Sequence, residues 1–161
     1  MKIYFLHGLE STNNSSKVDL MRALGHDVHA EYMDYKKVLD LYAKTLISIN
    51  DYNPDLIVGS SMGGYFAYHL GTHFSTNLLL LNPALPNRSF DPPILKDGDK
   101  KSRMWALIGR NDDVVNPVAN EEILKMAGAQ VTIGEHGHRT PQAIFEPFFK
   151  GVLRDISTGL D

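Results

Sequence analysis

The sequence predicts an α/β protein with a mainly parallel sheet of about six strands between two layers of helices. One observation is that short apolar runs alternate with longer segments of helical character, which is typical of a doubly wound sheet. Another is that most of these runs are continuously apolar, as expected for strands buried on both faces of a parallel sheet. The third is the length of 161 residues, which suits one domain that buries about two-thirds of the surface of its unfolded chain.

Six apolar runs are predicted as the strands, namely IYFL (3–6), VHAE (28–31), DLIVG (55–59), NLLLL (77–81), MWALIG (104–109) and AQVTIG (129–134). Five segments between or after them are predicted as helices, at about 16–24, 38–50, 63–73, 117–127 and 141–154. Pro117 and Pro141 are expected at the first positions of the last two helices, because the N–H that proline lacks would have no helical partner there.

The segment at residues 82–103 interrupts this alternation. It contains four of the eight prolines and shows no clear periodicity. The strands on both sides belong to one pattern, so we expect a single domain over residues 1–161, with 82–103 as a short lid or loop insertion. A passive connection is the alternative. Arg88 and Lys96 in this segment are weak candidates for contact with an anionic substrate.

Composition and charge argue against several classes of function. The chain has no cysteine, which excludes disulfides, thiolate metal sites and cysteine nucleophiles and fits a reducing compartment. The formal net charge is −3 and Lys and Arg form no basic run, so no nucleic-acid partner is expected. The first apolar stretch is too short for a signal peptide, and no stretch approaches the roughly 20 residues of a membrane helix. We therefore expect a cytoplasmic protein with no membrane span.

The stretch LIVGSSMGGYFA (56–67) raises the question of why a buried strand ends in small residues and hydroxyls. Gly59, Ser61 and Gly63 match the pattern G-x-S-x-G between a predicted strand and a predicted helix, the context that a nucleophile elbow requires. The nucleophile of such an elbow has an unfavourable backbone conformation, so the residues two before and two after it must be small. A tight turn without chemistry is the alternative. Ser60, at the x position of the motif, is assigned to the turn.

A serine nucleophile needs a base and an acid that orients the base, and in α/β hydrolases these follow in the order Ser, Asp, His. Asp112 and Asp113 follow the fifth predicted strand, and His136 and His138 follow the sixth. Both pairs lie just past the carboxyl end of a strand, and so at the same edge of the sheet as Ser61. Order, spacing and edge together predict a catalytic triad.

Three stretches resemble the small α/β-hydrolase esterases of the YqiA type, and the resemblance covers nearly the whole chain. They are an opening strand with its His-Gly loop, the elbow, and the Asn-Pro segment after the next strand: YFLHGLESTNNSSK, VGSSMGGYFAYHLG and LLLLNPALP. The elbow is shared by all α/β hydrolases, whereas the other two stretches are more particular to this family. The resemblance implies the α/β-hydrolase fold and a serine esterase that cleaves carboxylic esters or thioesters through an acyl-enzyme, without a cofactor.

The resemblance also implies roles for single residues. The family pattern favours Asp112 as the acid and His138 as the base. Asp113 is then a turn or capping residue, and His136 a loop histidine. The backbone N–H groups that the resemblance implies for the oxyanion hole are those of Leu9 and Met62.

Three other histidines are weaker candidates for functional residues. His7 is a candidate for contact with the substrate, although a structural hydrogen bond near the elbow is at least as compatible with its position. His69 and His73 have the i, i+4 spacing that can bind a metal on a helix, but no third ligand is near in sequence, so no metal site is expected. The stretch GSSMGG lacks the Lys-Ser/Thr of a phosphate-binding loop.

The sequence thus predicts a short-chain acyl esterase whose substrate is a small-molecule acyl ester or thioester. Two alternatives stay open, namely amide or peptide hydrolysis by the same residues and a hydrolase-fold binding protein that is catalytically silent. The intact set of Ser61, Asp112 and His138 argues against the second alternative.

Overall fold

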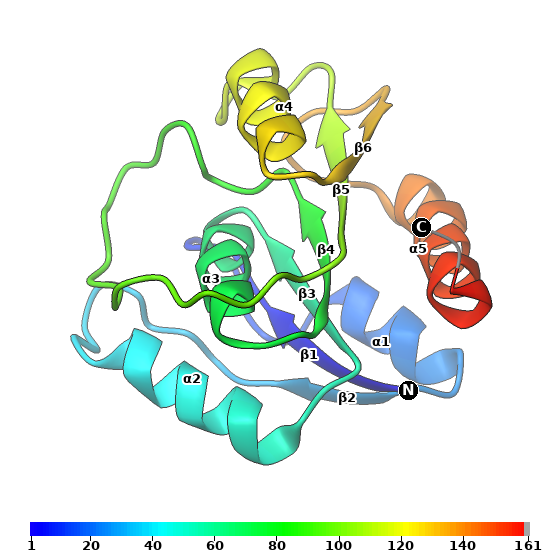
Figure 1. The fold of residues 1–161 in the computed structure, drawn as a ribbon. Helices are drawn as coiled ribbons and strands as arrows, with labels where there is room; N and C mark the ends of the chain where they lie inside the picture. Colours follow the sequence, from blue (N-terminus) through cyan, green and yellow to red (C-terminus); the bar gives the residue numbers. More distant parts are fainter. Residues whose placement is uncertain (160–161) are drawn as a thin grey trace.

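The chain forms one six-stranded sheet, parallel throughout, between two layers of helices, which confirms the predicted α/β fold class (Figure 1). The computed structural model describes residues 1–159, so the last two residues of the expected domain lie outside the described part. The strands are β1 (Lys2–Leu6), β2 (Asp27–Ala30), β3 (Leu56–Ser60), β4 (Asn77–Leu81), β5 (Met104–Gly109) and β6 (Gln130–Gly134). The helices are α1 (Ser16–Ala23), α2 (Leu41–Tyr52), α3 (Met62–Leu70), the short 3-10 helix η1 (Gly71–His73), α4 (Pro117–Met126) and α5 (Gln142–Thr158).

The two faces of the sheet bury separate hydrophobic clusters. Helices α1 and α5 cover one face, and α2, α3 and α4 cover the other (Figure 1). In β1, Ile3 and Phe5 pack into the first cluster, while Tyr4 and Leu6 pack into the second. Because both faces are covered, successive side chains of a central strand are all buried, which explains the continuously apolar runs in the sequence.

Several helix ends differ from the predicted ones by one to four residues. Pro117 is the first residue of α4, as predicted. Pro141 is not the first residue of α5 but its N-cap, because its ψ of 151° is extended and its carbonyl accepts the first N–H groups of the helix. Helix α2 begins at Leu41, three residues later than the sequence suggests, since the preceding residues form turns.

The strand order places three loops at one edge of the sheet. The order is β2-β1-β3-β4-β5-β6, so the chain moves outward from β1 to β2 and then returns to β3 on the other side. Ligands of open α/β sheets bind at the carboxyl ends of the strands near such a reversal. Because all pairings are parallel, the turns after β3, β5 and β6 bring Ser61, Asp112 and His138 to this edge.

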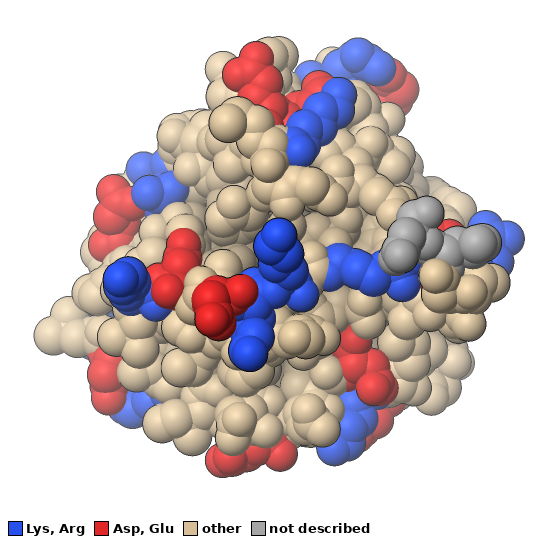
Figure 2. Space-filling model, viewed as in Figure 1, with Lys and Arg blue, Asp and Glu red and all other residues tan. Residues whose placement is uncertain are grey.

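Residues 82–103 contain no helix or strand and cross α3 in the view of Figure 1. Side chains hold this segment to α3, since the Arg88 guanidinium lies 4.1 Å from the centre of the Tyr65 ring and His69 Nδ1 lies 2.8 Å from the Asp97 carboxylate. On the face that the segment crosses, basic and acidic residues are interspersed (Figure 2). No helix within residues 1–159 is long and apolar enough to cross a membrane.

Candidate active site

Ser61 occupies a strained turn between β3 and α3. Its backbone angles are φ 55° and ψ −115°, in the positive-φ range that non-glycine residues rarely adopt. Its N–H donates to Leu81 C=O, and its C=O accepts from the N–H groups of Tyr65 and Ala84, each at 3.0 Å. Strain of this kind persists only where the surroundings enforce it, and here the first turn of α3 and the end of β4 do so.

The glycines around Ser61 have no room for a side chain. A Cβ on Gly63 would lie 2.1 Å from the carbonyl oxygen of Leu6, and one on Gly59 would lie 2.4 Å from that of Gly63. A Cβ on Gly64 would lie 2.8 Å from Pro83 Cβ. The strand therefore ends in small residues because α3 starts against the backbones of β1 and β3.

We expect Gly63→Ala to lower the free energy of unfolding by about 3 kcal/mol or more, because the added methyl overlaps backbone atoms of β1. Gly151→Ala in α5 is the matched control, since the nearest atom to its Cβ would be Arg154 Nη2 at 4.0 Å. There alanine should stabilise the helix by about 0.5–1 kcal/mol. Urea denaturation of both variants measures the difference, and a Gly63→Ala protein as stable as the wild type would contradict the steric explanation.

The structure brings Ser61, His138 and Asp112 into one chain of hydrogen bonds. His138 Nε2 lies 2.9 Å from Ser61 Oγ, and His138 Nδ1 lies 2.9 Å from Asp112 Oδ2 and 3.1 Å from Oδ1. An ionised carboxylate only accepts hydrogen bonds, so it favours the tautomer with the proton on Nδ1. The lone pair of Nε2 then faces the Ser61 hydroxyl, an arrangement that can activate a serine as nucleophile.

The Asp112 carboxylate is buried and held by backbone donors. Its side chain is 1% exposed, whereas that of His138 is 20% exposed. Oδ1 accepts hydrogen bonds from the N–H groups of Val114 and Val115, both at 2.9 Å. These bonds stabilise the negative charge and fix the plane of the carboxylate toward the imidazole.

Asp113 and His136, the alternatives beside Asp112 and His138, lie differently. Asp113 is exposed, and within residues 1–159 its side chain makes no hydrogen bond. His136 is buried, with Nδ1 2.7 Å from Gly137 C=O, and its Nε2 has no hydrogen-bond partner in the described part of the chain. Neither side chain is hydrogen-bonded to the Ser61 hydroxyl in that part.

The two N–H groups expected to form the oxyanion hole belong to the first residue of α3 and to the loop after β1. Met62 is the first residue of α3, where backbone N–H groups have no partner inside the helix. Leu9 follows Gly8, which lies against Ser61, since a Cβ on Gly8 would be 3.3 Å from Ser61 Cβ. Among the described residues, neither N–H group donates a hydrogen bond.

His7 is enclosed within the protein. It is 1% exposed, its Nδ1 lies 2.7 Å from Gly8 C=O, and its Nε2 accepts a hydrogen bond from Met33 N–H at 2.8 Å. Burial lowers the pKa of the imidazole, which favours the neutral tautomer that these two bonds require. Both ring nitrogens are thus occupied, and we assign His7 a structural role under the loop that carries Leu9 rather than contact with the substrate.

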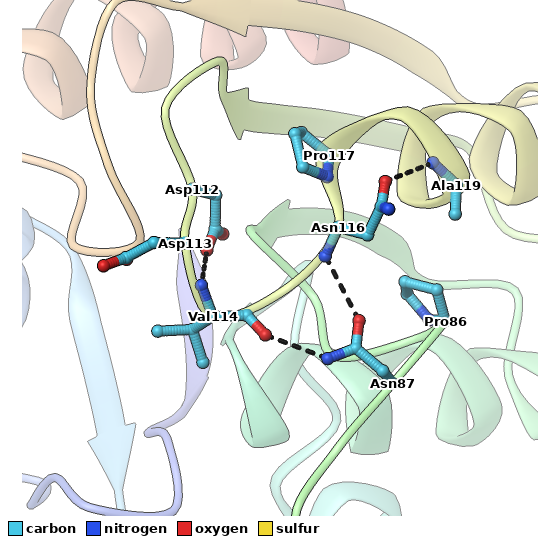
Figure 3. Close-up of a pocket in the computed structure, with 8 residues that line it drawn as sticks. All are labelled: Pro86, Asn87, Asp112, Asp113, Val114, Asn116, Pro117 and Ala119. Atoms are coloured by element: carbon cyan, nitrogen blue, oxygen red, sulfur yellow. Dashed lines mark hydrogen bonds between the residues drawn. The ribbon is translucent and has the colours of Figure 1, made fainter.

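An open pocket of about 620 Å³ lies beside the loop that carries Asp112 (Figure 3). The residues labelled in Figure 3 line it, and neither Ser61 nor His138 is among them, so the pocket lies next to the Asp112 loop and not over Ser61. Asn87 spans one side, donating to Val114 C=O at 2.9 Å and accepting from Asn116 N–H at 3.1 Å.

Two side chains near the site were not identified from the sequence, namely those of Asn82 and Asn87. The sequence places Asn87 only within the irregular segment 82–103, and it gives Asn82 no role beyond its part in the Asn-Pro stretch where a buried strand ends. No group of three or more potential metal ligands occurs within residues 1–159.

Comparisons with known proteins show which family and which solved structures the chain is similar to. The model of the family described as "Uncharacterised protein family (UPF0227)" matches residues 2–98. None of the curated proteins matches the sequence. The structure is similar to the ydeN gene product of B. subtilis, with a TM-score of 0.73 and 14% identity over 98% of each chain.

Two other solved structures share the fold at low sequence identity. A protein of Xanthomonas campestris pv. campestris assigned to the alpha/beta superfamily of hydrolases is 17% identical, with a TM-score of 0.70 over 96% of this chain and 98% of that one. A carboxylesterase of the ammonia-oxidizing thaumarchaeon Nitrososphaera gargenis is 11% identical, with a TM-score of 0.70 over 99% of this chain and 92% of that one. At these identities the likeness shows a common α/β-hydrolase fold.

Proposed function

The chain belongs to the family UPF0227, which is YqiA-like, and we propose that it is a serine hydrolase that cleaves carboxylic esters or thioesters. The observation that carries the proposal is the hydrogen-bonded chain Ser61–His138–Asp112, with the serine on a strained turn between a strand and a helix. The occurrence of a carboxylesterase with the same fold supports esters as the substrate class.

In the proposed acylation step, Ser61 Oγ attacks the acyl carbonyl while His138 Nε2 takes the hydroxyl proton. Asp112, 2.9 Å from Nδ1, stabilises the imidazolium that forms. The N–H groups of Met62 and Leu9 hold the tetrahedral oxyanion, at the positive end of α3. His138 then gives the proton to the leaving alkoxide or thiolate, and the acyl group stays on Ser61 as an ester.

In the deacylation step, a water molecule replaces the leaving group. His138 takes a proton from this water as its oxygen attacks the acyl-Ser61 ester. Collapse of the second tetrahedral intermediate breaks the bond to Ser61 Oγ, which recovers its proton from His138. The products are a carboxylic acid and the free enzyme, and every proton is accounted for without a cofactor.

The rate of hydrolysis of p-nitrophenyl butyrate, compared with that of the p-nitroanilide of butyric acid, tests the proposal. We expect p-nitrophenolate release well above the rate in buffer and little cleavage of the anilide, because an amide has a poorer leaving group. Comparable cleavage of the anilide would favour the amide-hydrolase alternative. No turnover of esters over a range of acyl lengths would contradict the proposal and favour a binding protein.

A further inference from the structure

Residues 81–87 are the last residue of β4 and the six that follow it, and they bond to all three loops that carry the proposed catalytic residues. Backbone groups in the first half of this segment bond to Ser61 from both sides. The Asn87 side chain bonds to the loop after β5, and the Asn82 side chain bonds to the loop after β6, which carries His138. One short segment therefore contacts loops from three different strands.

The Asn82 carboxamide joins the end of β5 to the loop after β6. Its Oδ1 accepts a hydrogen bond from Gly109 N–H at 2.7 Å. Its Nδ2 donates to the carbonyl of His138 at 2.7 Å and to that of Gly137 at 3.3 Å. Asn82 is only 1% exposed, so bulk water does not compete for these bonds.

The backbone of Asn82 is also unusual. Its φ is 42°, in the left-handed region that asparagine tolerates better than most residues. Its N–H donates to Leu107 C=O at 3.0 Å, which keeps the residue beside β5 where β4 ends. Both the backbone conformation and the side-chain bonds therefore suit asparagine at this position.

The partners of Asn82 lie at the base of two loops. One is the loop after β5 that carries Asp112, here called the acid loop, and the other is the loop after β6 that carries His138, here called the histidine loop. Gly109 C=O accepts a hydrogen bond from Asp112 N–H at 3.1 Å, so Gly109 is the base of the acid loop. The two loops touch here, because a Cβ on Gly109 would lie 2.4 Å from the carbonyl oxygen of Gly137. A single side chain thus fixes the backbone of His138 relative to the strand end from which Asp112 extends.

We infer that Asn82 is a positioning residue for the proposed hydrolysis, whose carboxamide ties the histidine loop to β5 and so sets the distances from the His138 imidazole to Ser61 and Asp112. This inference rests on the proposed function, since it concerns the same three side chains. The inference adds a fourth side chain to the three of the proposed mechanism. Hydrolysis at the full rate then also requires a buried amide that both donates and accepts hydrogen bonds.

Two substitutions remove hydrogen bonds of the Asn82 carboxamide in different ways. Asn82→Ala removes all three side-chain bonds. Asn82→Asp keeps the shape and the acceptor for Gly109 N–H, but an ionised carboxylate has no proton to donate and meets the carbonyls of Gly137 and His138 with lone pairs. A displacement of reacting groups by about 1 Å can cost about 10²-fold in rate, so we expect kcat/KM for p-nitrophenyl butyrate to fall by about that factor in both variants.

Asn77→Ala is the matched control on the same strand. Asn77 lies at the start of β4, where its Nδ2 donates to Asp55 C=O at 3.0 Å, away from the site edge. We expect kcat/KM of this variant to stay within about twofold of the wild type, as for most substitutions remote from the reacting groups.

Proton NMR gives a readout that a purely structural role would not change. The Nδ1–H of His138, hydrogen-bonded to Asp112, should give a downfield resonance in the wild type that Asp112→Asn alters and so identifies. In both Asn82 variants, measured below their unfolding temperatures, we expect this resonance to shift or broaden, and in Asn77→Ala to stay unchanged.

Wild-type kcat/KM in a folded Asn82 variant would overturn the inference. So would a lower rate with an unchanged His138 resonance, because the imidazole would then still be in place. If Asn82→Ala does not fold, Asn82→Asp decides, since it keeps the side-chain shape. Failure of the proposed function is a separate result, namely wild-type hydrolysis that persists in Ser61→Ala.

Discussion

Ser61→Ala should lower the hydrolysis of p-nitrophenyl butyrate by a factor on the order of 10⁶. The substitution removes the only hydroxyl within the described residues that is hydrogen-bonded to His138, so the base has no nucleophile to activate. The oxyanion donors and the fold remain, because Ser61 is held by backbone bonds that alanine keeps. Initial rates of p-nitrophenolate release measure the effect.

Ser60→Ala is the control for this prediction. Ser60 is the adjacent residue with the same side chain, but in the described part of the chain its hydroxyl makes no hydrogen bond to His138. Its rate should stay within about tenfold of the wild type, the scale of a small packing change near a site. Equal activity of Ser61→Ala and the wild type would mean that another group is the nucleophile, and the proposed mechanism would be wrong.

Asp112→Asn should lower kcat by about 10⁴-fold, the effect expected when the base is left in the wrong tautomer. The N–H groups of Val114 and Val115 require an acceptor at Oδ1, so the amide nitrogen of the variant takes the place of Oδ2, 2.9 Å from His138 Nδ1. There it donates to Nδ1, and the imidazole proton moves to Nε2. A protonated Nε2 cannot take the Ser61 proton.

Asp113→Asn makes the same chemical change one residue away. Because the Asp113 side chain is exposed and unbonded within residues 1–159, we expect kcat to change by less than about threefold, as for an ordinary surface substitution. Steady-state kinetics of the two variants on one ester decide the assignment. Asp112→Asn within a few-fold of the wild type would show that Asp112 is not the acid.

The strands and the tight turn at Ser61 are predictable from sequence because their signals are local. A buried parallel strand is apolar along its whole length, and the turn at Ser61 needs glycine at 59 and 63 because backbone atoms lie where a Cβ would be. The start of α5 is predicted one residue too early, at Pro141, because proline suits both the N-cap with extended ψ and the first helical position.

The supports of the site are less predictable because their partners are distant in sequence. Asp112 and Asp113 are chemically identical neighbours, and only the fold shows which carboxylate is buried and bonded to backbone N–H groups. Asn82 bonds to residues 27 and 56 positions further along the chain, so its partners emerge only when β4 and β5 pair and the loop after β6 closes over them. His7 is similar, since Met33 N–H occupies its Nε2.

The parallel strand order has a consequence for synthesis of the chain. Parallel neighbours are joined by crossovers rather than hairpins, so every pairing in the sheet is non-local and we expect folding in the slower range for a chain of this size. Ser61 and His138 are separated by 77 positions, and synthesis delivers the N-terminal part first. In the proposed mechanism, a nascent chain therefore carries the Ser61 hydroxyl without its base while it emerges from the ribosome. The serine becomes reactive in this mechanism only when the loop after β6 brings His138 to it.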